Sequence, residues 1–252
     1  MRLLELWFFS MDSAFYAKVP TGKDVMKMPQ YRHEWKHLIC PSDRLVLRSR
    51  LQAVCQADRH AECGHYQIRS LYFDTPADKA LREKLDGVSR REKFRLRYYN
   101  FDTGLIHLEK KSKLGGLGTK DMAEVTPAEA QAIVAGQLDW MAGSGRPLLQ
   151  ELYLKTKVQG LRPRTIVDYT REPFVYAPGN VRVTLDYDIR TGLSSTDFLN
   201  PDCVTIPAGD APAILEVKWD AFLPEIIRDA VQLKDRQATA FSKYAACRIY
   251  GV

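Results

Sequence analysis

The sequence has few cysteines, no long apolar run and no standard nucleotide-binding loop. Its five cysteines, at positions 40, 55, 63, 203 and 247, form no CxxC pair, which disfavours a disulfide framework and favours a reducing cytoplasm. No run approaches the roughly 18 apolar residues of a membrane span. The glycines at 115, 116 and 118 lack the GxxxxGK[ST] spacing, so a phosphate-cradling loop of that type is not indicated.

What remains is the composition of an ordinary globular protein, with 45% hydrophobic and 27% charged residues. The 37 Lys and Arg residues outnumber the 31 Asp and Glu residues, giving a net charge of +6 that favours an anionic partner. Residues 1–28 carry no clear periodicity, and we interpret them as an N-terminal extension. One domain is expected over residues 29–252.

The order of strand and helix patterns predicts an α+β fold in which neighbouring strands are antiparallel. Strand patterns occupy residues 31–40, 66–75, 90–101, 105–113, 162–175, 181–190 and 213–220. Helix patterns occupy residues 41–57, 77–85, 127–135, 146–159, 225–233 and 238–247. A turn at 102–104 joins two strands into a hairpin, and a glycine-rich loop is expected at 114–120.

Charged side chains alternate with apolar ones along five of these strands, so the charges of each strand share one face. Four cations at intervals of about 7 Å follow one strand: Arg91, Lys93, Arg95 and Arg97. Such a row repels itself unless a polyanion or a metal–phosphate complex lies along it. The other charged faces carry Glu34, Lys36, Glu109, Lys111, Lys113, Arg182, Asp186, Glu216 and Lys218.

A single charged face is ordinarily the solvated side of an antiparallel sheet. Five faces built almost wholly from Arg, Lys, Asp and Glu favour another arrangement, in which the sheet closes with these faces inward. Its interior would be a cationic tunnel containing a few carboxylates. Such a tunnel suits a linear chain of phosphates together with a divalent ion.

Eight short motifs are distributed along most of the chain, at residues 32–36 (RHEWK), 70–75 (SLYFDT), 94–97 (FRLR), 108–111 (LEKK), 168–171 (DYTR), 182–186 (RVTLD), 215–218 (LEVK) and 241–244 (FSKY). Their order resembles that of the VTC domain, the polyphosphate polymerase domain of the vacuolar transporter chaperone complex, which is a branch of the triphosphate tunnel metalloenzymes. The resemblance implies a closed antiparallel β tunnel with helices packed outside.

The resemblance also implies an activity, in which the γ-phosphate of ATP is transferred to a growing polyphosphate chain with the help of Mn²⁺ or Mg²⁺. It implies catalytic roles for Arg95, Arg97, Lys111, Arg171, Arg182 and Glu216. Phosphate-binding roles are implied for Lys36, Lys93, Lys113, Lys120, Lys218 and Lys243. The metal ligand would be Glu216, joined by Glu34 and Glu109. The expected partners are ATP and polyphosphate or triphosphate, without nucleic acid, and the expected location is the cytoplasm.

Two other functions stay open on the sequence alone. One is a metal-dependent tri- or polyphosphatase. The hydrolase branch of the tunnel enzymes carries an acidic-x-acidic-x-Lys first strand, however, and Arg32 replaces the first acid here, which leaves fewer carboxylates for two metals. The other is a non-catalytic polyphosphate- or nucleotide-binding module. A zinc site at His60, Cys63 and His65 is disfavoured by its spacing.

Overall fold

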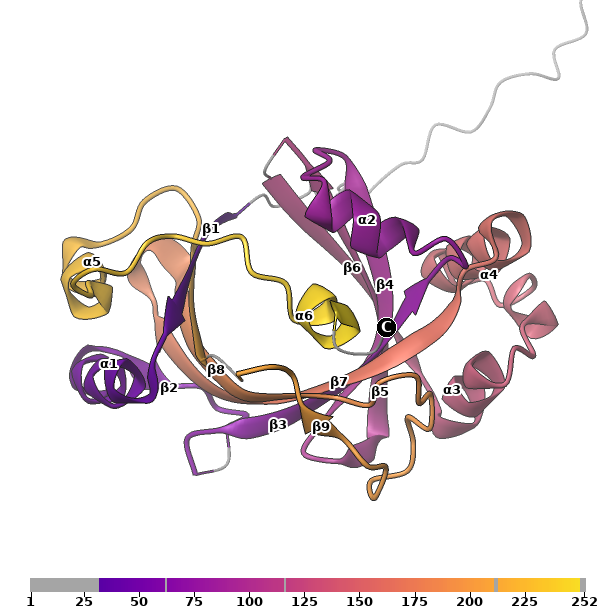
Figure 1. The fold of residues 1–252 in the computed structure, drawn as a ribbon, viewed down its shortest axis with the longest axis horizontal. Helices are drawn as coiled ribbons and strands as arrows, with labels where there is room; N and C mark the ends of the chain where they lie inside the picture. Colours follow the sequence, from indigo (N-terminus) through magenta and orange to yellow (C-terminus); the bar gives the residue numbers. More distant parts are fainter. Residues whose placement is uncertain (1–31, 62, 116, 211–212, 250–252) are drawn as a thin grey trace, which may run out of the picture. The chain divides into compact units, whose positions relative to one another are not determined.

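The computed structural model describes residues 32–61, 63–115, 117–210 and 213–249. The predicted extension at residues 1–28 lies outside these ranges and stays a prediction. One antiparallel sheet runs through the described residues in the order β1-β10-β8-β7-β3-β4-β5-β6 (Figure 1). These strands are β1 (His33–Ile39), β3 (Tyr66–Asp74), β4 (Arg91–Tyr99), β5 (Asp102–Leu114), β6 (Leu117–Val125), β7 (Arg162–Tyr176), β8 (Val181–Thr191) and β10 (Ala213–Trp219). Two short strands, β2 (Gln56–Ala57) and β9 (Ile206–Pro207), pair with β7 and β8.

The sheet curls strongly, so its two edge strands approach each other around a concave face (Figure 1). This confirms the predicted α+β tunnel fold in the form of a half-barrel. Among the described residues no backbone ladder joins β1 to β6, so hydrogen bonding does not complete the predicted closure. A side-chain contact joins the two ends of the sheet instead, because Lys113 Nζ of β5 lies 3.4 Å from Glu34 Oε2 of β1.

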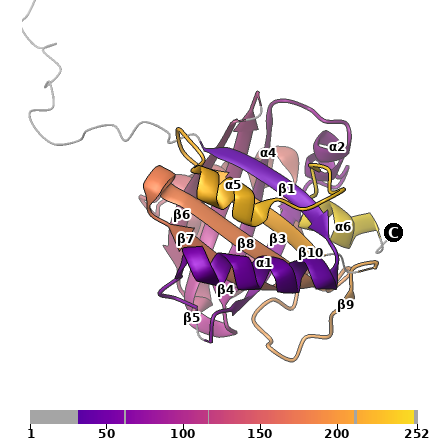
Figure 2. The ribbon, with the colours of Figure 1, turned by 90° about the vertical axis from the view of Figure 1, so that its left-hand side faces the viewer.

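Four helices cover the convex side of the sheet (Figures 1 and 2). The apolar side chains of the alternating strands are buried beneath these helices. The helices are α1 (Pro41–Val54) and α5 (Glu225–Val231) over one end, and α3 (Pro127–Val134) and α4 (Pro147–Gln159) over the other. Each pair of helices completes a separate hydrophobic core. Leu51 of α1 belongs to the same core as Val183 and Val217. Leu149 of α4 belongs to the same core as Leu96 and Leu108. This convex burial leaves the charged residues of the same strands on the concave face.

The remaining two helices lie nearer the concave side. The helix α2 (Lys79–Leu85) packs against β4, and α6 (Lys243–Ile249) lies within the curl against β7 and β8 (Figure 1). There Tyr244 of α6 stacks on Tyr72 of β3 with ring centroids 5.0 Å apart. Helices thus pack outside the sheet as predicted, and α6 in addition fills part of the interior. None of the helices formed by the described residues is long and apolar enough to cross a membrane.

Some predicted boundaries are wrong. The helix predicted over residues 41–57 ends at Val54, because Gln56–Ala57 form the strand β2. The strand β6 occupies most of the region predicted as a glycine-rich loop, which is reduced to the turn between β5 and β6. The preceding hairpin turns at Asn100 and Phe101, both with positive φ, rather than at 102–104. The last helix begins at Lys243, and the segment before it instead reaches β1, where the Thr239 amide donates to the Lys36 carbonyl (2.7 Å).

Candidate functional site

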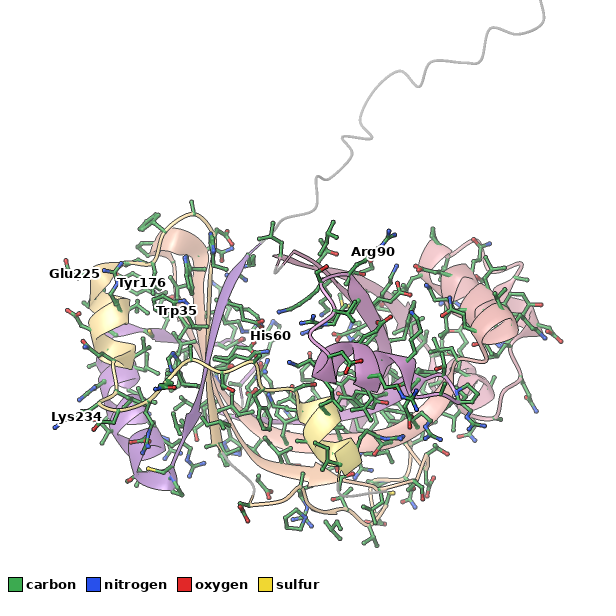
Figure 3. The ribbon with its side chains drawn as sticks, turned by 45° about the horizontal axis from the view of Figure 1, so that its top comes forward. Trp35, His60, Arg90, Tyr176, Glu225 and Lys234 are labelled. Atoms are coloured by element: carbon green, nitrogen blue, oxygen red, sulfur yellow. The ribbon has the colours of Figure 1, made fainter. Side chains whose placement is uncertain are left out.

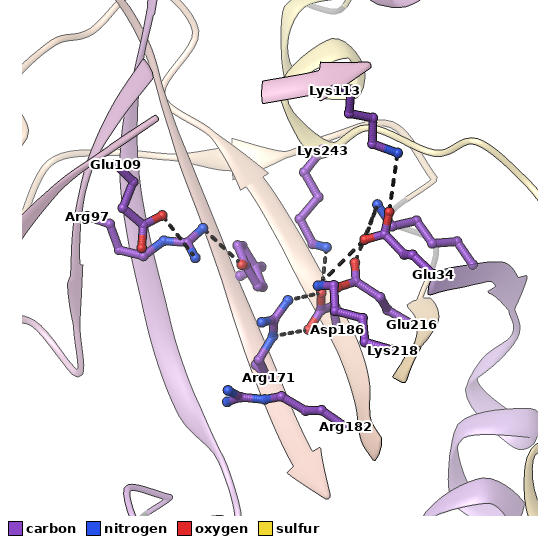
Figure 4. A network of polar contacts seen from close by, with 12 residues as sticks. Glu34, Arg97, Glu109, Lys113, Arg171, Arg182, Asp186, Glu216, Lys218 and Lys243 are labelled. Atoms are coloured by element: carbon purple, nitrogen blue, oxygen red, sulfur yellow. Dashed lines mark hydrogen bonds and ion pairs between the residues drawn. The ribbon is translucent and has the colours of Figure 1, made fainter. Parts of the chain in front are cut away.

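The structure gathers the predicted site residues on the concave face of the curled sheet (Figure 4). Strand alternation explains this placement, because the apolar neighbours of these residues point into the convex cores. All of the predicted side chains on strands are brought to this face: Glu34, Lys36, Lys93, Arg95, Arg97, Glu109, Lys111, Lys113, Lys120, Arg171, Arg182, Glu216 and Lys218. The predicted Lys243 reaches the same region from the start of α6.

Glu109 is the centre of the first charge cluster. Its side chain is 1% exposed and lies 2.5 Å from Arg95, 2.6 Å from Lys120 and 3.9 Å from Arg97. Burial alone would raise the pKa of Glu109, but these three cations outweigh it and hold the pKa well below its usual range. The cation row is thus partly neutralised from within the protein. The role of Glu109 as a metal ligand, which the resemblance implies, stays a prediction.

Neutral oxygens fix the orientation of the two central arginines. Arg95 Nη1 donates to the Tyr72 hydroxyl (2.8 Å). Arg97 Nε donates to Ser70 Oγ (3.0 Å), and its Nη2 donates to the Tyr169 hydroxyl (3.1 Å). Sequence reasoning missed these three partners, although each lies on the same face of a charged strand or its neighbour. Arg95 Nε also donates to Glu109 (2.7 Å), so each guanidinium is fixed through more than one of its nitrogens. The N–H groups that these contacts leave free are available to phosphate oxygens.

The second charge cluster lies across β1 and β10, where acidic and basic side chains alternate. The strand register pairs Glu34 with Lys218 and Lys36 with Glu216. Lys36 lies 3.3 Å from Glu34 and 3.4 Å from Glu216, and Lys218 contacts the same two carboxylates. Although burial opposes ionisation, these lysines and Lys113 lower the pKa of Glu34 to about 2, and Lys218 and Lys36 hold that of Glu216 well below its usual value. Both carboxylates are therefore charged at neutral pH.

Asp186, which was not predicted as a site residue, connects this cluster to α6. Arg171 grips it through two hydrogen bonds of 2.6 and 2.7 Å, and Lys243 Nζ lies 2.5 Å away. Burial would raise the pKa of Asp186, but Arg171 and Lys243 lower it to about 2. Its place in the RVTLD motif, on the same face as Arg182, was the available signal.

Arg182 occupies a separate position near the N-terminal end of β8. Its Nη2 donates to Asp58 (2.8 Å) and to the Tyr66 hydroxyl (2.7 Å), and its side chain is 39% exposed. It thus shares the concave face without joining the ion-pair network around Asp186. Asp58, distant in sequence, neutralises Arg182, and the catalytic role that the resemblance implies for Arg182 stays a prediction.

Lys93 and Lys111 differ from every other predicted cation on this face. Among the described residues, neither ammonium has a carboxylate within ion-pair distance or a hydrogen-bond partner. The ammonium of Lys93 lies over the Tyr72 ring, 5.5 Å from its centroid. Burial and neighbouring cations, Arg95 above all, lower the pKa of both lysines well below the usual 10.5. The contributing charges include Lys36 and Lys218 on the far side of the curl. Two uncompensated cations thus face one region, and an anionic ligand would neutralise them.

The depressed lysine pKa values predict that tripolyphosphate binding takes up protons. Bound phosphate would return the pKa of Lys93 and Lys111 toward 10.5, so between the lowered and restored values the complex holds more protons than the free protein. Affinity should therefore fall as pH rises through that window. Without phosphate, the unfolded chain holds more protons than the folded protein in the same pH window. The free energy of unfolding should therefore rise with pH across that window.

Calorimetry in two buffers of different ionisation enthalpy, at mildly alkaline pH, measures this uptake directly. The apparent binding heats should differ between the buffers, and the difference should shrink in Lys111→Met. Equal heats in both buffers for the unsubstituted protein would show that binding does not protonate these lysines.

A divalent metal, which the family resemblance implies, would need oxygen ligands on this face. Glu34 and Glu216 supply ionised carboxylates. Thr184 lies in register with Glu216 on the adjacent strand, and its buried hydroxyl has no hydrogen-bond partner among the described residues. Within the described ranges, no group of three or more His, Cys, Asp and Glu side chains forms a protein-only ligand set. The donors present fit Mg²⁺ or Mn²⁺ bound by one or two carboxylates together with substrate phosphates.

Comparison with protein families decides the affiliation, since the family model of the VTC domain matches residues 31–250. The chain belongs to the VTC domain family. That family places it among polyphosphate- and triphosphate-related enzymes. No curated protein matches the sequence.

Some solved structures resemble this VTC domain at low sequence identity. The PH1012 protein from Pyrococcus horikoshii OT3 is 14% identical, covering 84% of this chain and 96% of that chain, with a TM-score of 0.46. A candidate adenylate cyclase from Bacillus halodurans is 15% identical, covering 75% of this chain and 80% of that chain, with a TM-score of 0.43.

Proposed function

We propose that this VTC domain binds a linear phosphate chain along its concave face and transfers the γ-phosphate of ATP to polyphosphate. The observation that carries the proposal is that Lys93 and Lys111 lack a carboxylate within ion-pair distance, whereas the other predicted site cations are paired. Both side chains are half-buried, and a partly desolvated cation without a partner is unfavourable, which favours the binding of an anion. A phosphate chain supplies charge of the right sign and linear shape.

Phosphoryl transfer asks the protein chiefly for positioning and charge neutralisation, and the residues fit these tasks. Arg95 and Arg97, held by Glu109 and by the tyrosine and serine hydroxyls, direct their remaining guanidinium N–H groups to phosphate oxygens. Lys93 and Lys111 act as point charges that stabilise the negative charge of the transferring group. When bound, a divalent ion at Glu216 and Glu34 would neutralise further phosphate oxygens. No serine, cysteine or histidine nucleophile is required.

The deciding experiment incubates the purified protein with ATP and Mn²⁺ and resolves ADP, free phosphate and polymer. We expect ADP to form while the transferred phosphate is recovered in polymer. Free phosphate released in equal amount to ADP, without polymer, would replace the polymerase proposal with a phosphatase. Binding of tripolyphosphate without any ADP formation would instead establish a non-catalytic binding module.

A further inference from the structure

The cation row of β4 continues beyond Lys93 to the rim of the sheet beside α2. Arg91, one alternation before Lys93, faces the same side and pairs in register with Lys113 of β5. Lys84 of the neighbouring helix α2 is half-buried. The electrostatic neighbours of Lys84 are Arg91, Lys36 and Lys113, so its ammonium lies in the field of the concave face. Arg90, labelled in Figure 3, adds a further cation at this rim.

These rim cations are not neutralised by the protein. Among the described residues, neither Lys84 nor Arg91 lies within ion-pair distance of a carboxylate, and the guanidinium of Arg91 donates only to the Val88 carbonyl. The pKa of Lys84 is lowered by burial and then by Arg91, which agrees with a crowded, unpaired cation. Arg182 differs from these two rim cations, because Asp58 neutralises it.

We propose that Lys84 and Arg91 form an outer subsite, which binds the part of an extended polyphosphate chain that lies beyond the phosphates held by Lys93 and Lys111. The inference rests on the proposed function and adds to it the direction of the chain and a preference for long polymers. From Arg97 to Arg91 the row spans about 20 Å, from the rise of six strand residues. A tripolyphosphate covers only part of that length, whereas a long chain reaches the rim.

The test compares the affinities of tripolyphosphate and of size-fractionated long-chain polyphosphate for two double variants at one moderate ionic strength. Lys84→Ala with Arg91→Ala removes the outer subsite. Arg50→Ala with Lys157→Ala removes the same net charge from α1 and α4 on the convex side, where Arg50 bonds the Gln232 carbonyl and Lys157 pairs with Asp139.

Loss of two charge-assisted contacts should weaken long-chain binding by about tenfold in the Lys84/Arg91 variant. Tripolyphosphate affinity should change less than about twofold, which also verifies that the variant is folded, and the convex-side variant should bind both ligands normally. An unchanged ratio of long-chain to tripolyphosphate affinity would overturn the outer subsite alone, as would an equal loss in the convex-side variant. If the unsubstituted protein binds neither ligand, the proposed function itself fails.

Discussion

Replacing Lys93 and Lys111 together by methionine should make the free protein more stable and abolish its binding of tripolyphosphate. Methionine retains the length of the apolar stem and removes two cations that have no carboxylate within ion-pair distance among the described residues. At about 1 kcal/mol for each relieved charge, the thermal midpoint should rise by about 4–8 °C for a chain of this size. Without the two ammonium groups, tripolyphosphate affinity should fall by at least about a hundredfold. Thermal denaturation with and without the ligand measures both effects.

Lys110→Met is the matched control. Lys110 is adjacent to Lys111 in β5 but lies on the opposite face, where it is 2.6 Å from Glu151 and 3.6 Å from Glu92. Its loss should leave tripolyphosphate affinity unchanged and lower stability slightly, because partly exposed pairs contribute little. A destabilised Lys93/Lys111 variant that still binds tripolyphosphate would contradict the role given to these lysines.

Glu216→Gln should separate phosphate binding from metal-assisted turnover. The substitution keeps the side-chain shape but removes the charge that a hard cation needs, so turnover with Mn²⁺ or Mg²⁺ should fall by at least about a hundredfold. Without metal, tripolyphosphate affinity should be retained or increased, because Lys36 and Lys218 lose a competing carboxylate. Initial rates at several metal concentrations and metal-free calorimetry give the two quantities.

Glu172→Gln controls for the stability cost of the Glu216 change. Glu172 is also buried and ion-paired, with Arg44 and Arg48, but it belongs to the α1 side of the sheet. Both substitutions leave cations with one carboxylate fewer, so both should destabilise the fold. Only Glu216→Gln should lose turnover. Activity equal to the unsubstituted protein would remove Glu216 from the catalytic site, whereas equal loss in both variants would indicate a structural effect.

Strand alternation allowed the concave face to be predicted before the fold was known. The period of two assigns Lys93, Arg95 and Arg97 to one face whatever the neighbouring strands, so their convergence depends only on the direction of curl. Strand β6 was missed because it is an edge strand with many exposed positions, and glycines at its start suggested a loop. Its Lys120 nevertheless reaches Glu109, because β6 pairs in register with β5.

Partners across the sheet could not be predicted from one sequence. Arg182 with Asp58 and Arg171 with Asp186 depend on register and on the path of loops, neither of which alternation specifies. For the same reason the sequence showed a self-repelling cation row but not that Glu109 neutralises its central part. The partners therefore change the interpretation of individual charges, and Lys93 and Lys111 are distinguished only once the partners of the other predicted site cations are known.

The most direct test of the central claim is a crystal structure of the protein with tripolyphosphate and Mn²⁺. The account predicts phosphate oxygens within hydrogen-bond distance of Lys93 and Lys111, further oxygens on Arg95 or Arg97, and the anomalous signal of Mn²⁺ beside Glu216. Phosphates bound only on the convex helices, or a tripolyphosphate that leaves Lys93 and Lys111 without contact, would contradict it.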